Sequence, residues 1–79
     1  MTMFYTYVLL CSDNQHYIGY SANLKNRIFE HESGKVPATK LRLPIKLIYY
    51  EACKSKDKAL LREKYFKTGF GRRFLNSRL

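Results

Sequence analysis

Two β-prone runs separated by a short polar segment open the chain, and they limit its possible folds more than any other feature. Phe4–Cys11 is rich in aromatic and branched residues, and His16–Tyr20 has the same character. The polar residues Ser12–Gln15 between them predict the turn of an antiparallel hairpin. Side chains alternate along a strand, so the length of this loop decides the facing of Tyr7 and Tyr17. A loop with an odd number of residues places them on one face, and a two-residue turn separates them.

A helix and a third strand are predicted next. Ser21 is a good N-cap for a helix over Ala22–Glu32, and Gly34 is placed as its C-terminal stop. A basic loop bounded by two prolines follows. Ile45–Glu51 has the composition of a strand.

The last third of the chain predicts two helices. Ser55 is placed to cap a helix over Lys56–Lys67, which carries apolar residues at near-helical spacing. Gly69 and Gly71 are expected to break it, and Arg72–Leu79 to form a short terminal helix. The fold class is therefore α/β, with a three-stranded, mainly antiparallel sheet flanked by helices in the order β-β-α-β-α-α. Three strands cannot bury both faces of a sheet alone, so the helices must cover them.

Length and charge narrow the class of protein. With 79 residues we expect a single domain spanning residues 1–79, and the 46% apolar content argues against disorder. The net charge is +9, and Lys54–Leu79 contains nine basic residues against the two acids Asp57 and Glu63. So dense a basic surface favours a polyanionic partner, most commonly nucleic acid. The alternatives are a solvated face and, less favoured, an acidic membrane surface.

Other features point to a cytoplasmic protein. No apolar run approaches the ~20 residues that span a membrane, and no secretory signal opens the chain. Cys11 and Cys53 lack the spacing of a zinc or redox motif, which predicts two small buried apolar residues in a reducing compartment.

Four polar side chains near the hairpin carry the chemistry. Tyr7 and Tyr17 lie on the two predicted strands, and Arg27 and His31 are four residues apart on one face of the predicted helix. Residues of these types can accept a proton from water and hold a phosphate. The set points to phosphodiester chemistry.

These residues resemble the GIY-YIG nuclease family. The first family motif corresponds to Tyr5-Thr6-Tyr7, in which only the last tyrosine is kept, and the second is intact as Tyr17-Ile18-Gly19. The family arginine matches Arg27, and the following His or Tyr matches His31. The phrases Tyr-Ile-Gly-Tyr-Ser, Leu-Ile-Tyr-Tyr-Glu-Ala and Arg-Glu-Lys-Tyr-Phe-Lys-Thr-Gly are similar to small stand-alone bacterial members, which resemble the N-terminal module of excinuclease C. This resemblance covers nearly the whole chain and implies a role in DNA repair.

The resemblance also implies roles for individual residues. Tyr7 is favoured as the base with Tyr17 assisting, Arg27 stabilises the charge on phosphorus, and all five of Tyr7, Tyr17, Arg27, His31 and Glu63 belong to the catalytic site. Glu63 matches the single metal-binding glutamate and is expected to hold one Mg²⁺ or Mn²⁺ ion with water and substrate phosphate. Glu51 and Glu30 are alternatives that lack the family position. Asn76 is available for the asparagine found in many members, without a confirming motif. We expect these side chains to converge on one face of the sheet.

The predicted function is that of a metal-dependent endonuclease acting on nucleic acid, DNA more than RNA. The residues expected to contact nucleic acid are basic and mostly C-terminal: Lys35, Lys40, Arg42, Arg62, Lys64, Lys67, Arg72 and Arg73. The alternatives are a nucleic-acid-binding module that cuts nothing and an accessory subunit whose site a partner completes. The basic segment Lys54–Leu79 is compatible with the endonuclease, the binding module and the accessory subunit.

Overall fold

The computed structural model describes residues 2–79, and its elements follow the predicted order. The strands are β1 (Phe4–Leu10), β2 (His16–Ser21) and β3 (Lys46–Cys53). The helices are α1 (Leu24–Glu32), α2 (Lys56–Phe66) and α3 (Gly69–Arg78), with a short 3₁₀ helix η1 (Lys40–Arg42) before β3. The sheet order is β2-β1-β3, and both pairings are antiparallel. The predicted fold class is therefore confirmed.

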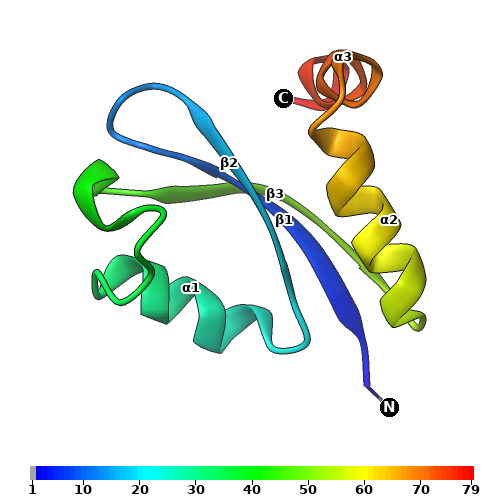
Figure 1. Cartoon of the computed structure of the whole chain (residues 1–79), viewed down its shortest axis with the longest axis horizontal. Helices are drawn as coiled ribbons and strands as arrows, with labels where there is room; N and C mark the ends of the chain where they lie inside the picture. Colours follow the sequence, from blue (N-terminus) through cyan, green and yellow to red (C-terminus); the bar gives the residue numbers. More distant parts are fainter. Residues whose placement is uncertain (1) are drawn as a thin grey trace.

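Helices cover the two faces of the sheet separately, as Figure 1 shows. The even-numbered residues of β1 face α2 and α3: the Thr6 hydroxyl donates to the Ala59 carbonyl at 2.8 Å, and Val8 packs with Phe66 and Leu75. Burial of a side chain as large as Phe66 stabilises the fold by about 1.5–3 kcal/mol. The odd-numbered residues of β1, Tyr7 among them, therefore face the side on which α1 lies.

The ends of α1 and α2 show which capping predictions hold. Ser55 does cap α2, since its hydroxyl accepts from the Lys58 amide at 3.2 Å. Gly34 ends α1 with a φ of 74°, a backbone angle that glycine adopts without strain. The prediction for Ser21 is wrong. Ser21 still pairs with β1, and Asn23 caps α1 by accepting from the Asn26 amide at 3.1 Å.

The predicted break between the last two helices is confirmed, but it lies at Lys67 and Thr68 rather than at Gly69 and Gly71, and the last helix starts at Gly69 rather than at Arg72. Thr68 caps α3 by accepting from the Gly71 amide at 3.1 Å, and both glycines lie inside the first turn. A Cβ at Gly71 would overlap the backbone carbonyl of Tyr65 and lie 2.7 Å from the Cα of Phe66. Gly71 thus serves close approach of α3 to the end of α2.

The two cysteines are both free thiols. Cys11 is buried, as predicted, whereas Cys53 is only half-buried and its thiol donates to the Ser55 carbonyl at 3.2 Å. Across residues 2–79, no helix combines the length and apolar character that crossing a membrane requires.

Candidate active site

The hairpin loop has the odd length that brings the two tyrosines together. Leu10 pairs with His16, so the five residues Cys11–Gln15 connect the strands. Tyr7 pairs with Gly19 and Leu9 pairs with Tyr17, which places both tyrosines on one face. Their ring centroids are 6.4 Å apart.

Gly19 makes room for the Tyr7 ring. A Cβ at position 19 would overlap the Cζ and hydroxyl of Tyr7 and lie 2.7 Å from its Cε2. The ring therefore lies against the backbone of β2 at Gly19, on the edge strand next to β1. The glycine of the Tyr17-Ile18-Gly19 motif is thus required by the position of the Tyr7 phenol.

A buried hydrogen-bonded chain starts at this phenol. The Tyr7 oxygen lies 2.7 Å from Nε2 of His31, and Nδ1 of His31 lies 2.7 Å from Oγ1 of Thr39. All three side chains are 0% exposed. Tyr17 packs edge-on against His31, with ring centroids 5.2 Å apart. The His31 imidazole, which α1 supplies, is therefore held between the loop before η1 and the strands β1 and β2.

Burial determines the protonation states of this chain. Burial raises the pKa of Tyr7, and the nearby Arg27 guanidinium opposes part of that shift. Burial likewise lowers the pKa of His31, and the positive charge of Arg27 lowers it further. At neutral pH the site therefore contains a protonated phenol beside a neutral imidazole.

Arg27 extends from α1 towards the same phenol, as its position four residues before His31 predicts. Its side chain is 36% exposed and lies 3.5 Å from the Glu30 carboxylate. The guanidinium thus contacts the buried chain on one side and remains accessible to a phosphate on the other.

Glu63 lies on a helix that covers the face of the sheet opposite to Tyr7. Helix α2 covers the Thr6 and Val8 face, so the expectation that all five residues lie on one face of the sheet is wrong for Glu63. Its negative charge nevertheless contributes to the raised pKa of Tyr7. Helix α2 also contacts β2, the strand that carries Tyr17.

The other two candidate carboxylates are held in structural ion pairs. Glu51 accepts two bonds from Arg62, at 2.9 and 2.8 Å, and one from the Tyr49 hydroxyl at 2.7 Å, and the Arg62 contact is the main cause of its lowered pKa. Glu30 pairs with Arg27. Glu63 contacts Lys67 at 3.5 Å, the same distance that separates Glu30 from Arg27, and 24% of its side chain is exposed.

The donor set suits one type of metal site. Within residues 2–79, no three His, Cys, Asp or Glu side chains cluster as ligands. A single carboxylate such as Glu63 fits Mg²⁺ or Mn²⁺ bound mainly through water and substrate phosphate. It does not fit a preformed zinc centre.

The basic residues divide into paired and exposed groups. Arg42 binds Asp13 at 2.8 Å and ties the hairpin loop to η1. Arg62 pairs with Glu51 and lies over the Phe66 ring, 4.6 Å from its centroid. These two arginines therefore act within the fold, unlike the exposed residues Lys35, Lys40, Lys64, Arg72 and Arg73.

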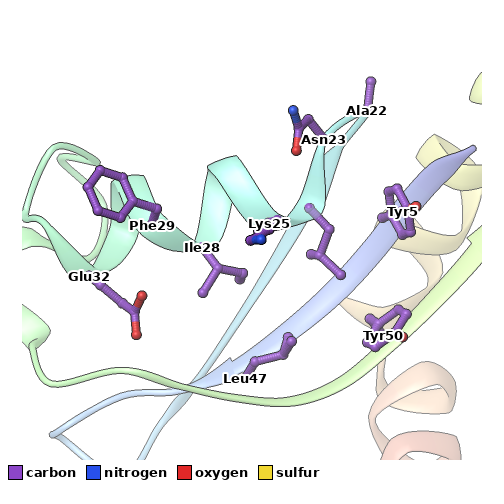
Figure 2. A pocket seen from close by; sticks show the side chains of 10 residues that line it. Tyr5, Ala22, Asn23, Lys25, Ile28, Phe29, Glu32, Leu47 and Tyr50 are labelled. Carbon is purple, nitrogen blue, oxygen red and sulfur yellow. The ribbon is translucent and has the colours of Figure 1, made fainter. Parts of the chain in front are cut away.

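Two cavities lie away from the tyrosines. An open apolar groove of about 690 Å³ separates α1 from β1 and β3, with Ile28 above Leu47 and with Tyr5 and Tyr50 at one end (Figure 2). Asn76 lines a smaller cavity of about 250 Å³ with Arg72 and His16, at the hairpin end of β2. Neither of these two cavities is lined by Tyr7, His31 or Glu63.

Comparison with known proteins agrees with this geometry. Residues 3–76 match the family model described as the GIY-YIG catalytic domain. The chain therefore belongs to the GIY-YIG family of nucleases, whose members generally depend on a divalent metal and act on nucleic acid.

Two relatives match most of this chain, which spans about two thirds to three quarters of their length. The chain is 45% identical over 64 residues to the UPF0213 protein spr1390 of Streptococcus pneumoniae, covering 80% of this chain and 65% of that one. It is 47% identical over 64 residues to the UPF0213 protein SAG0778 of Streptococcus agalactiae, covering 80% and 73%. The solution structure of the UPF0213 protein BH0048 from Bacillus halodurans superposes with a TM-score of 0.61 at 33% identity, covering 95% of this chain and 83% of that one.

One residue of the buried chain has no sequence signal. Thr39 lies in the basic loop, eight residues after His31, and resembles any polar loop residue. Only the folded arrangement places its hydroxyl behind the imidazole.

Proposed function

We propose that this protein is a metal-dependent endonuclease that hydrolyses phosphodiester bonds in nucleic acid, with DNA favoured over RNA. The observation that supports this most strongly is the 2.7 Å contact between the buried Tyr7 phenol and His31, with Arg27 beside it. A domain that only binds nucleic acid has no use for a desolvated phenol joined to a neutral imidazole. The family to which the chain belongs supports the same class of reaction.

The phenol requires a partner to act as a base. Because the pKa of Tyr7 is raised, its oxygen carries a proton at neutral pH and must release it to accept another. Nε2 of His31 is the acceptor at hydrogen-bond distance. In the proposed step the water oxygen bonds to phosphorus, the water proton passes to the Tyr7 oxygen, and the phenol proton passes to Nε2 while the bond to the leaving oxygen breaks.

Two residues would stabilise the negative charge that develops during hydrolysis. Arg27 stays protonated and has a planar fork that matches phosphate oxygens, so it stabilises the negative charge that builds on phosphorus. Glu63 would hold the single Mg²⁺ or Mn²⁺ ion, which supplies positive charge near the leaving oxygen when bound. Tyr17 packs against His31 and limits access of bulk water to the proton path.

Exposed lysines and arginines would hold the substrate. Lys35, Lys40, Lys64, Arg72 and Arg73 are available for phosphate contacts, and Lys67 becomes available when Glu63 turns towards a metal. Contacts to phosphate position a strand without reading its sequence. We therefore expect weak sequence preference.

A cleavage assay tests the proposal. Labelled single-stranded, duplex and branched DNA and RNA are incubated with Mg²⁺, with Mn²⁺ or with chelator. Wild type should cut at least one substrate in a metal-dependent manner, and Arg27→Ala should cut about a thousandfold more slowly, equivalent to ~4 kcal/mol of transition-state stabilisation. Lys25→Ala, which removes one exposed positive charge from the same helix, should retain cleavage. Tight binding without cleavage of any substrate would favour the non-catalytic module instead.

A further inference from the structure

Thr39 occupies a capping position without using its side chain as a cap. It precedes η1, and in the described chain its hydroxyl makes no hydrogen bond to the backbone of that helix. Threonine at such a position ordinarily accepts from an amide one turn ahead. Here Oγ1 lies 2.7 Å from Nδ1 of His31 instead, and the side chain is completely buried. The Thr39 hydroxyl thus bonds a distant side chain in place of the nearby helix amide. This exchange indicates that the contact with His31 serves the site.

The hydrogen-bond partners of Tyr7 decide which imidazole nitrogen carries the proton. A phenol that is protonated at neutral pH has one hydrogen to donate, and a buried donor needs an acceptor; within residues 2–79 the hydrogen-bond partner of the buried Tyr7 oxygen is His31. Nε2 of His31 is that acceptor, since it lies 2.7 Å away. Nε2 is then unprotonated, and Nδ1 carries the hydrogen and donates it to Thr39.

We propose that Thr39 is a positioning residue, which accepts a hydrogen bond from Nδ1–H and holds His31 in the tautomer whose Nε2 can receive the Tyr7 proton. The tautomer is inferred from these two contacts of the buried imidazole, and only its consequence for the reaction rests on the proposed function. The hydrogen bond made by the second ring nitrogen sets the tautomer of a histidine in general. After proton transfer both nitrogens carry hydrogen, and the oxygen of Thr39 stabilises the imidazolium.

The surroundings of His31 leave this role to Thr39. The charged or titratable groups facing the imidazole are Tyr7 and Tyr17 from the strands and Arg27 and Glu30 from its own helix. The two tyrosines contact its ring, and the two charged residues act through their fields. Within residues 2–79, Thr39 is the partner hydrogen-bonded to Nδ1.

The tautomer can be measured without any substrate. Nitrogen-15 NMR of protein labelled at histidine distinguishes a protonated from an unprotonated ring nitrogen. Wild type at neutral pH should show Nδ1 protonated and Nε2 unprotonated for His31. Thr39→Val, which keeps the shape and removes the hydroxyl, should show a mixture of tautomers, and Thr39→Ser should show the wild-type pattern. Finding Nε2 protonated in wild type would overturn the proposal, whether or not the protein cuts nucleic acid.

Kinetics test the consequence. Thr39→Val should lower kcat by about tenfold or more with KM nearly unchanged, the scale seen when the outer partner of a functional histidine is removed. The acid limb of the pH profile of kcat for Thr39→Val should also move to lower pH. The reason is that an imidazolium without an acceptor at Nδ1 is less stable, so the pKa of His31 falls. Thr39→Ser should have the wild-type kcat and the wild-type acid limb. Equal kcat values for Thr39→Val and wild type would overturn a positioning role. Absence of cleavage by wild type would refute the proposed function, leaving the NMR result to decide the role of Thr39. If Thr39→Val does not fold, the wild-type and Thr39→Ser spectra decide the tautomer.

Discussion

Replacing Gly19 with alanine should destabilise the protein through one contact. The added Cβ would overlap the Cζ and hydroxyl of Tyr7 and lie 2.7 Å from Cε2. The ring cannot move away easily, because it is 0% exposed and bonded to His31. Overpacking of this kind costs about 1–3 kcal/mol. In a domain of this size, each kcal/mol lowers Tm by about 4–8 °C.

Thermal and urea denaturation of matched variants isolate that cause. Gly69→Ala is the control, since its Cβ would meet no atom of the described chain within 4 Å. An alanine in that first helical turn should leave stability unchanged or raise it by up to about 1 kcal/mol. In a Tyr7→Leu background, which lacks the outer ring atoms, Gly19→Ala should lose most of its effect. Equal stabilities of Gly19→Ala and Gly69→Ala would refute the reasoning.

Three further predictions concern salt and pH. If about five phosphates are neutralised, the logarithm of the affinity for nucleic acid should fall with log salt at a slope of about −4, and a flat response would contradict the polyanion assignment. The free energy of unfolding should decrease as pH falls below about 6.5, because the lowered pKa of His31 lets the unfolded chain bind more protons; melts of His31→Gln should lack this step. The free energy of unfolding should also decrease as pH rises above about 10, because burial raises the pKa of Tyr7 and the unfolded chain ionises first; Tyr7→Phe should reduce this loss, to which Tyr49, whose pKa is also raised by burial, contributes.

Local signals predicted most of the fold. The hairpin, the third strand and the Ser55 cap follow from short-range composition, and the structure agrees with them to within a few residues. The Ser21 cap failed because Ser21 and Asn23 are equally good caps two residues apart, and strand pairing with Tyr5 decided between them. Gly71 was misread because a glycine that admits a neighbouring backbone looks like a helix breaker in sequence.

The site was less predictable because it depends on contacts between elements. The spacing of Arg27 and His31 placed both on one side of α1, and the odd loop that joins the tyrosines was one of two possibilities. The position of Glu63 depends on which face of the sheet α2 covers, which no local pattern specifies. The position of Thr39 behind His31 depends on the path of an irregular loop.

Glu63 is proposed to take part in cleavage rather than in binding. Replacing Glu63 with Gln removes the proposed metal ligand and one negative charge from a basic surface. Without metal, affinity for nucleic acid should stay level or rise, because repulsion of phosphate is relieved. Asp57→Asn removes the same charge from an exposed position in the first turn of α2 and serves as the control.

Two measurements on one labelled substrate test the role of Glu63: the rate of cleavage and the affinity without metal. Both are made for wild type, Glu63→Gln and Asp57→Asn. We predict that cleavage by Glu63→Gln falls about a thousandfold, or ~4 kcal/mol, while Asp57→Asn cuts like wild type and all three bind with similar affinity. If Glu63→Gln cuts as fast as wild type, Glu63 is a surface carboxylate and the proposed metal site is contradicted.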